Sequence, residues 1–540
     1  LAGKHANWFE FADSLVAQLL RDVSWKSWAS LGSVLPILAE IAPDVFIDSL
    51  RKSIEKGANG AIFIIDQENK VFGSNSHTYL IWSLELLLWQ RESFLSTVKL
   101  ISDISRLLRN DKRKGDMQSM LHNCLRAYHA QTIASNEEKK KACTILIKSN
   151  QELAAALFGS LLPSRGTCLL DTNYMPKSLE GFEYPRRLSI SNYDFWEQVK
   201  LSIECLGKIG TPYSVSLLIT KLPSLVTSDV KDAALSLIAG VDAAEDFANG
   251  NIVREALRES IYWQYRLGEK MDRDLPDKVL DFLFEQWERL SPQDIAEKYK
   301  WLFCYHPDPP YETEEFVSGQ DPRVLEDRKK ALEIVFEQTS WFETLMKLID
   351  ISDQPHIITE TMSFMDVSKF SDTLYTMPLN SNPKRELFYV SFIGKCILTQ
   401  KAQSVVVDEA VIQFGIDGDV LRLALQLLAI EPTIALWERV DQLDESIISE
   451  YWKRYNVFRL DLEDERLCQA LIKLLQVGRA SAMVELLWHS LHYSKTLELP
   501  SGIEEILEAL LSLLRKPDVC QQLVQSGYEI RGLLDGLHAR

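Results

Sequence analysis

One histidine and its neighbours come nearest to a chemical site in this chain. His77 lies in a polar turn, residues 72–78 (FGSNSHT), which enters a helix expected to run to Gln90. Backbone amides at a helix start bind anions, so this turn and His77 are suited to hold one. Ser76 would also serve as a simple helix cap there, and we favour that structural interpretation.

A second pair of histidines has the spacing of metal ligands. His489 and His492 stand three residues apart, which places both side chains on one helix face. Nothing nearby in the sequence supplies further ligands, so we interpret them as surface or packing histidines. The eight cysteines include no pair closer than nineteen residues, which excludes a CxxC metal knuckle and indicates reduced thiols in core positions.

The motifs of several enzyme classes are absent. The sequence contains no GxxxxGK[ST], GxGxxG, GxSxG or HExxH pattern, so nucleotide hydrolysis, α/β-hydrolase chemistry and zincin chemistry have no local support. An enzyme whose residues converge only in the fold stays open as an alternative, with His77, His306 and the acidic residues near Asp308 as candidates. We assign no catalytic, cofactor-binding or metal-ligating residue and expect no cofactor.

Two charged segments suggest partners. Residues 106–114 (RLLRNDKRK) gather five basic residues at an expected helix end, as a phosphate-contacting patch does, although such cations also suit the helix dipole. We favour the dipole explanation and do not expect nucleic acid as a partner. The acidic loop 311–316 would suit a basic protein or would be simply solvated.

Tryptophans recur at helical spacing. Trp25 and Trp28 form one such pair, and Trp82 and Trp89 form another. We interpret these residues as core packing rather than as platforms for stacked bases.

The elements that would position these residues are helices. Residues 461–492 contain two amphipathic helices on either side of a turn at Gly478, with leucines at the 3.6-residue period on both sides. Such a hairpin cannot bury its apolar face alone, so neighbouring hairpins must stack on it. The predicted fold is all-α, an α-α superhelix (solenoid) of stacked TPR-like or HEAT-like hairpins.

Prolines mark many of the expected helix starts, because the missing proline N–H costs nothing at the first helical position. The prolines interpreted in this way are Pro43, Pro212, Pro292, Pro322, Pro432 and Pro517, with Ser291 before Pro292 as the clearest cap. The expected helices are 7–22, 25–40, 43–56, 77–90, 92–109, 117–132, 137–148, 150–161, 195–209, 213–222, 228–239, 251–266, 275–289, 292–304, 385–399, 419–430 and 444–455.

Two segments rich in proline, glycine and polar residues interrupt the helical pattern, at 163–190 and 306–319. They divide the chain into three expected blocks: an N-terminal helical block (1–165), a middle HEAT-like block (166–305) and a C-terminal TPR-like block (306–540). The net charge of the first block differs from that of the rest of the chain. Residues 1–165 hold 20 basic against 17 acidic side chains, and residues 166–540 hold 39 against 60, which favours a basic protein partner or simple solubility.

Composition indicates a globular chain: 46% of the 540 residues are hydrophobic and 25% are charged. No apolar run is long enough for a transmembrane helix, and we expect no membrane partner and a cytoplasmic location. The first residues, LAGKHANWFEF, lack a signal-peptide pattern and an initiator methionine, which suggests a chain that starts inside a longer polypeptide.

Three segments carry a family resemblance: 28–50 (WASLGSVLPILAEIAPDVFIDSL), 71–89 (VFGSNSHTYLIWSLELLLW) and 464–487 (DERLCQALIKLLQVGRASAMVELL). They resemble the C-terminal helical-repeat region of large bacterial STAND-type NTPases of antiviral defence. In that family an effector and a nucleotide-binding core precede a superhelix that recognises a foreign protein. The matching residues are turns and cores, so no functional residue is carried over.

The resemblance implies a sensor module without chemistry of its own. Its partner would be a phage structural or packaging protein, and an oligomerising ATPase elsewhere in the parent protein would respond to binding. A general adaptor for a host complex is the alternative among binding proteins. The sequence names neither the partner nor the concave surface.

Overall fold

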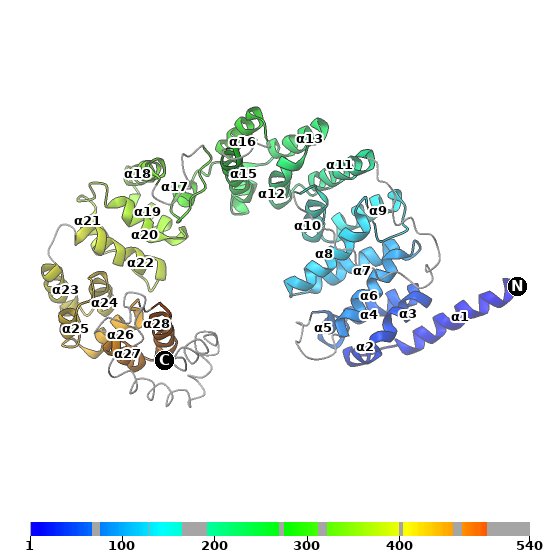
Figure 1. Cartoon of the computed structure of the whole chain (residues 1–540), viewed down its shortest axis with the longest axis horizontal. Coiled ribbons are helices and arrows are strands. Elements are labelled where there is room, and N and C mark those ends of the chain that lie inside the picture. Colours follow the sequence, from blue (N-terminus) through cyan, green and yellow to red (C-terminus); the bar gives the residue numbers. More distant parts are fainter. Residues whose placement is uncertain are drawn as a thin grey trace. The chain divides into compact units, whose positions relative to one another are not determined.

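The computed structural model is helical throughout the part of the chain that it describes, and that part contains no strand (Figure 1). The described residues are 2–66, 76–128, 130–164, 192–268, 275–311, 321–398, 403–456 and 467–493. The chain divides into two compact units. Unit 1 comprises Leu1–Pro292 with Asp308–Glu314, and unit 2 comprises Gln293–Pro307 with Glu315–Arg540.

Unit 1 contains the first sixteen α-helices. Their bounds are α1 Ala2–Leu19, α2 Trp25–Leu31, α3 Leu35–Ile41, α4 Pro43–Ile54, α5 Ile62–Ile65, α6 Ser76–Trp89, α7 Phe94–Leu107, α8 Asp111–Leu125, α9 Asn136–Ser149, α10 Gln151–Leu161, α11 Asn192–Ile209, α12 Pro212–Lys221, α13 Ser228–Ala239, α14 Ala243–Ala248, α15 Ile252–Gly268 and α16 Asp277–Arg289.

Unit 2 contains the remaining helices. Their bounds are α17 Ile295–Tyr299, α18 Pro322–Phe336, α19 Trp341–Ile351, α20 Pro355–Met362, α21 Ser371–Tyr375, α22 Pro383–Phe392 continued by a π-helical turn at Ile393–Ile397, α23 Gln403–Asp417, α24 Val420–Ala429, α25 Ile434–Val440, α26 Glu445–Arg454, α27 Leu467–Gln476 and α28 Ala480–Tyr493.

Helices of unit 1 stack in two rows. One row runs α7, α9, α11, α13, and the other runs α8, α10, α12, α15, with each helix packed against the next in its row. Adjacent helices such as α11 and α12 connect the rows. Gly207 permits one close approach, because a Cβ there would lie only 2.8 Å from Leu237 of α13. Each hairpin therefore buries its apolar face against the hairpin before and after it.

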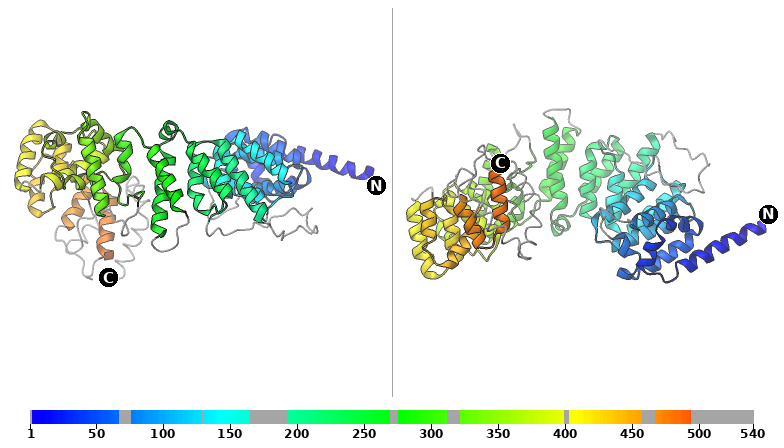
Figure 2. Two further views of the ribbon diagram at one scale, coloured as in Figure 1. Left: turned by 90° about the horizontal axis from the view of Figure 1, so that it is seen from above. Right: turned by 60° about the horizontal axis from the view of Figure 1, so that its bottom comes forward.

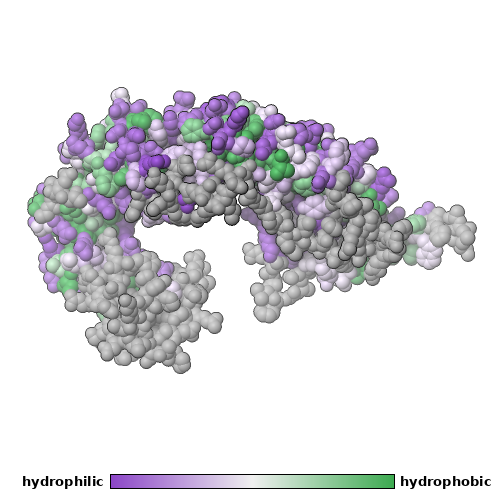
Figure 3. All heavy atoms as spheres, turned by 45° about the horizontal axis from the view of Figure 1, so that its top comes forward, coloured by the Kyte–Doolittle hydropathy of each residue, from purple (hydrophilic) through white to green (hydrophobic). Residues whose placement is uncertain are grey.

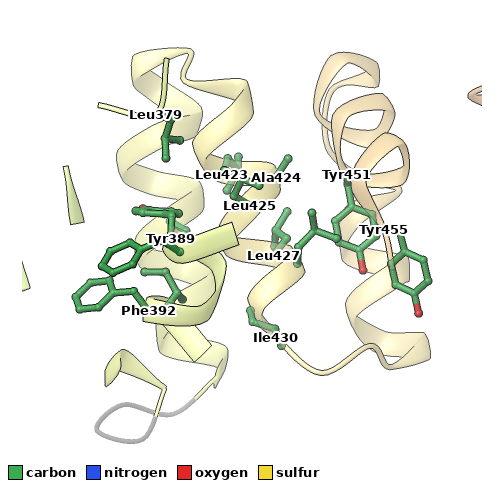
Figure 4. Packing of buried hydrophobic residues seen from close by; sticks show 14 of the residues in the cluster. Leu379, Tyr389, Phe392, Leu423, Ala424, Leu425, Leu427, Ile430, Tyr451 and Tyr455 are labelled. Atoms are coloured by element: carbon green, nitrogen blue, oxygen red, sulfur yellow. The ribbon is translucent and has the colours of Figure 1, made fainter. Parts of the chain in front are cut away.

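Unit 2 repeats this arrangement. Helices α18, α20, α22, α24 and α26 form a row in which each contacts the next. Figure 4 shows α24 between its two neighbours, with Leu423 and Leu427 directed into the packing between Tyr389 of α22 and Tyr451 of α26. Figure 2 shows the helices of each unit standing side by side. The predicted class, an all-α superhelix of stacked hairpins, is confirmed within each unit.

The hairpin predicted over 461–492 is confirmed over its described part. Helix α27 ends at Gln476, and Gly478 adopts a φ of +77°, which glycine tolerates best. The amide of Arg479 then donates to the carbonyl of Leu474, which closes the turn at 2.9 Å. Residues 461–466, which belonged to the predicted hairpin, lie outside the described residues.

Several predicted helix starts are right, and two are wrong. Helices α4, α12 and α18 begin at the expected prolines. At Pro292 the prediction fails, because Asp294 caps a later start by accepting the Glu297 amide. At Pro432 it fails for the same reason, since the Thr433 hydroxyl caps α25. Pro517 lies outside the described residues.

Two predicted helices in unit 1 need correction. The helix expected over 25–40 is broken into α2 and α3 at Gly32, which has a φ of +39°. The helix expected over 117–132 begins earlier, as α8, because the Asn110 side chain accepts the amides of Lys112 and Arg113, and it ends at Leu125.

The division into two units differs from the three expected blocks. Helices α9 and α10 pack against α11 and α12, so the helices on both sides of residues 165–191 belong to unit 1. The expected boundary near 305 lies close to the boundary between the units. Among the described helices, none has the length and apolar character needed to cross a membrane.

Candidate functional site

Two sequence candidates, His77 and the basic run 106–114, meet where α6 packs against α8. His77 is buried near the start of α6, and its charged neighbours Arg113, Asp116 and Lys112 all belong to α8. Burial lowers the pKa of His77, and the nearby Arg113 lowers it further. A neutral imidazole lacks the charge that would attract an anion. Residues 72–75 of the proposed anion-binding turn lie outside the described part.

Most of the basic run is engaged in the fold. Arg113 is buried, and its Nη1 donates to Asp116 Oδ2 at 2.8 Å. Arg106 pairs with Asp103 at 3.2 Å, and Lys114 pairs with Asp111 at 3.3 Å. These carboxylates offset the positive charge that a phosphate backbone would require. The sequence predicted that this run lies at one helix end. In the structure it instead spans the junction between α7 and α8.

Glu85 joins this cluster and was missed by sequence reasoning. It interrupts the apolar surface of α6, and no hydrogen bond reaches its carboxylate from the described residues. Burial, with a smaller effect from Asp116, raises the pKa of Glu85 to about 7. The only sequence signal for a buried carboxyl group was the position of Glu85 among leucines. The α6–α8 contact thus contains a carboxyl group that titrates near neutrality.

Of the four tryptophans predicted to pack in the core, Trp28 and Trp89 are buried, and Trp25 and Trp82 are partly exposed. Trp28 is fully buried and meets the edge of Phe46 with ring centroids 5.7 Å apart. Trp25 lies 4.8 Å from the Phe63 ring, and Trp89 is buried. Trp82 is half-buried against Tyr79. Four described cysteines, Cys124, Cys143, Cys205 and Cys396, are also buried free thiols, as expected.

The residues of the enzyme alternative come from both units. Asp308 belongs to unit 1, where Arg258 Nη1 donates to its backbone carbonyl at 2.7 Å. His77 instead contacts the charged groups of α8. His306 is exposed in unit 2.

The remaining candidates lie largely outside the described residues. The backbone at His489 and His492 belongs to α28, but their side chains are outside that part of the chain. In the acidic loop 311–316, only Tyr311 is described. The described residues contain no group of three or more His, Cys, Asp or Glu side chains that could hold a metal ion.

Buried arginines in unit 2 form contacts that the sequence did not reveal. Arg422 Nη1 and Nη2 donate to the carbonyls of Tyr375 and Met377, both at 2.8 Å, while Nε donates to Asp419. Arg328 bonds two carbonyls near the end of the preceding helical segment, and Arg479 bonds two at the end of α26. Each arginine thus donates to backbone carbonyls near a helix end, where the intrahelical donors run out.

Unit 1 contains a buried arginine of another kind. Arg254 has only 2% of its surface exposed and lies 4.5 Å from the centre of the Trp287 ring. Its Nε and Nη1 are buried without a hydrogen-bond partner in the described structure. Burial lowers the pKa of Arg254, while Glu255 and Glu288 oppose that shift. This guanidinium is held by a ring and by carboxylate charge rather than by hydrogen bonds.

Exposed aromatic side chains mark the surface of both units. Seven aromatic residues in described helices and loops are more than half exposed: Trp8, Phe9, Phe11, Tyr193, Trp263, Tyr305 and Phe364. Figure 3 shows apolar residues among hydrophilic ones on the face in view. Aromatic residues are enriched in protein interfaces, where they carry much of the binding energy. Exposed aromatic side chains of this kind fit a protein-interaction surface.

No protein-family model matches the chain, and no curated protein matches it. Among solved structures, the chain is similar to a circular tandem repeat protein with novel repeat topology and enhanced subunit contact surfaces. The identity is 11% and the TM-score is 0.20, over 98% of this chain and 99% of the other. A likeness at that TM-score carries no argument, so the helical-repeat fold rests on the helices and their contacts. That fold fits a scaffold or protein-interaction module.

Proposed function

We propose that this chain is a protein-recognition module without chemistry of its own, and that it is the target-sensing superhelix of a bacterial antiviral STAND-type NTPase. The observation that carries the recognition role is the set of exposed aromatic residues on a stack of otherwise well-packed helices. Trp263 of α15, for example, is 56% exposed, although its neighbour Tyr262 is buried. Exposed aromatic rings gain free energy when a partner covers them.

Charge supports a partner of a particular kind. Residues 166–540 have 21 more acidic than basic side chains. An acidic surface attracts a basic protein over distances of about a Debye length, roughly 8 Å at physiological salt, and repels nucleic acid phosphates. The sensor proposal accordingly favours a basic phage structural or packaging protein. The role in defence rests on the family resemblance.

Affinity capture from infected and uninfected bacteria tests recognition. The tagged chain is expected to retain a phage protein from infected lysate, and the double variant Trp263→Ser with Phe364→Ser is expected to lose it. A matched control, Asp281→Ser with Glu333→Ser, changes exposed residues in the same two regions but leaves the aromatic rings in place. Capture of host proteins alone would favour a general adaptor and would contradict the sensor role.

The parent reading frame provides an independent test of the defence role. A STAND-type parent is expected to encode a GxxxxGK[ST] phosphate loop upstream of this chain. A parent without that motif would refute the sensor assignment, while the protein-recognition role would stand on the capture experiment.

A further inference from the structure

Two buried thiols meet where α9 packs against α11. Cys143 belongs to α9 and Cys205 to α11, and these two helices are neighbours in one row of unit 1 (Figure 1). A side-chain hydrogen bond joins the two cysteines. Only 5% of Cys143 and 2% of Cys205 is exposed, and both are free thiols. The packing of two successive hairpins therefore brings together two cysteines that are distant in the sequence.

The two thiols of this pair differ in their affinity for a proton. The hydrogen bond from Cys143 lowers the pKa of Cys205, and the positive charge of Lys208 on the same helix lowers it further, against burial and Glu204. The same hydrogen bond, together with burial, raises the pKa of Cys143. Cys143 thus keeps its proton and donates it to the sulfur of Cys205. Cys205 is the thiolate of the pair, and the thiolate is the form of cysteine that reacts with oxidants.

A third thiol lies nearby but has different contacts. Cys124 of α8 is fully buried, and its Sγ donates to the carbonyl of Leu121 in the same helix at 3.2 Å. Burial raises the pKa of Cys124 to about 12. Cys124 therefore stays protonated and bonded within its own helix, while Cys143 is bonded to Cys205. The contacts single out Cys143 and Cys205 as the pair that can react together.

We propose that Cys143 and Cys205 form a disulfide when this chain meets hydrogen peroxide, so that a covalent bond joins α9 to α11. In the first step the sulfur of Cys205 attacks one oxygen of the peroxide, and the O–O bond breaks. Hydroxide leaves and combines with the proton that Cys205 had lost, which gives the first water. Cys205 is thereby oxidised to a sulfenic acid, and the peroxide is reduced.

The second step uses Cys143. Oxidation removes the negative charge of Cys205 and the hydrogen bond to it, which is the main cause of the raised pKa of Cys143. Cys143 can then release its proton, and its sulfur attacks the sulfur of Cys205. The S–O bond of the sulfenic acid breaks, and the departing hydroxide takes that proton to form the second water. In sum, two thiols and one peroxide give one disulfide and two waters.

The position of this disulfide determines its effect on the fold. The bond would join the hairpin of α9 and α10 to the hairpin of α11 and α12, so the two could no longer separate along this row. Because both thiols are buried, peroxide reaches them through local opening of unit 1, and the reaction is expected to be slow. A reducing environment would restore the thiols. This inference does not depend on the proposed recognition role.

Peptide mapping by mass spectrometry, after the whole chain has been treated with hydrogen peroxide and its remaining thiols blocked, tests the bond. We expect a cross-linked peptide pair that contains Cys143 and Cys205 and that dithiothreitol separates. Hydrogen exchange in peptides of α9 and α11 should become at least tenfold slower in the oxidised chain. The absence of the cross-link would overturn the inference, as would a bond from Cys205 to Cys124 or Cys168 or unchanged exchange in both helices.

Two single variants test the roles of the two thiols. Cys143→Ser is expected to abolish the cross-link and to leave Cys205 as a sulfenic acid that dimedone traps. Cys205→Ser is expected to slow oxidation of Cys143 at least tenfold, since no thiolate remains in the pair. Cys396→Ser is the matched control, because it removes a buried thiol of unit 2 and should leave the cross-link intact. Circular dichroism checks that each variant folds, and equal oxidation of Cys143 with and without Cys205 would contradict the proposed sequence of steps.

Discussion

Arg254 in unit 1 and Arg422 in unit 2 are both buried, yet their surroundings differ. Arg422 bonds the carbonyls of Tyr375 and Met377 and a nearby carboxylate, and it also lies 5.2 Å from the Tyr389 ring. Arg254 lies over Trp287 with no hydrogen bond to its buried Nε and Nη1. Burial alone therefore does not predict how much a charged residue contributes to the free energy of unfolding. The contribution depends on the groups that would lose a partner if the charge were removed.

The same contrast separates other buried charges. In unit 2, Arg328 and Arg479 each bond two backbone carbonyls from an earlier segment, so they connect one hairpin to the one before it. In unit 1, Glu85 is largely buried and receives no hydrogen bond from the described residues. Some buried charges in unit 1 are well bonded, such as Arg113 with Asp116. Arg254 and Glu85 are the informative exceptions.

The largest expected effect is that of Arg422→Met, which should lower the free energy of unfolding of unit 2 by about 3 kcal/mol. The change removes the donor of the Met377 carbonyl and the Nε donor of the Asp419 carboxylate. It also removes one of the two donors to the Tyr375 carbonyl, which keeps the Tyr389 hydroxyl. Arg422→Lys should restore little, since an ammonium cannot span both carbonyls and the carboxylate in the same way. Urea unfolding, with hydrogen exchange of peptides from α22 and α24, measures the loss.

Arg439→Ala is the control for this experiment. Arg439 pairs with Asp408 on the surface of unit 2, and both side chains are about half exposed. A surface pair contributes little, so the free energy of unfolding should change by less than about 1 kcal/mol. If Arg439→Ala destabilised unit 2 as much as Arg422→Met, then burial and hydrogen bonding would not explain the contribution of Arg422 to stability.

Arg479→Met is expected to cost about 2 kcal/mol, less than the loss at Arg422. Its Nη1 serves the carbonyls of Trp452 and Tyr455, at 3.0 and 2.8 Å, but no carboxylate. Fewer groups thus lose a donor. Hydrogen exchange should accelerate at the end of α26, and unchanged exchange there would show that Arg479 does not connect the two hairpins.

Glu85→Gln is expected to stabilise unit 1 by about 1–2 kcal/mol at pH 8. The folded-state pKa of about 7 lies above the ordinary 4.5, so the native state holds a proton that the unfolded state has lost between these values. Stability of the unchanged chain therefore falls as pH rises from about 4.5 to about 7. The variant avoids this loss. Thermal unfolding of both proteins from pH 4 to pH 8 should show curves that converge at low pH, and parallel curves would contradict the assignment to Glu85.

Local sequence patterns predicted the helices better than they predicted these charge contacts. The glycine turn at Gly478 and the start of α12 at Pro212 depend on residues a few positions apart, so both were predictable. The start expected at Pro292 failed within that same short range, because Asp294 competes as a cap. Arg422 was not predictable, since its carbonyl partners lie 45 and 47 residues earlier in the chain.

The candidate sites also depend on contacts that are distant in the sequence and were therefore not predictable. His77 and the run 106–114 were identified separately, and only the packing of α6 on α8 brings them together. The exposure of Trp8 and Phe11 on α1 was missed because an apolar helical period predicts burial. In the structure, the same helix carries a buried Val16 and a largely exposed Trp8 and Phe11. The pattern shows that a residue is apolar, but not which neighbour covers it.

The smallest expected effect is that of Arg254→Met, which should change the free energy of unfolding of unit 1 by less than about 1 kcal/mol. Methionine can keep contact with Trp287, no described hydrogen bond is lost, and the cost of burying a charge disappears. The remaining cost comes from Glu255 and Glu288, which lose an attractive neighbour. Urea unfolding of the Arg254→Met and Arg422→Met variants compares the two sites directly. A loss at Arg254 equal to that at Arg422 would mean that the carboxylates, and not the hydrogen bonds, decide the value of a buried arginine in this chain.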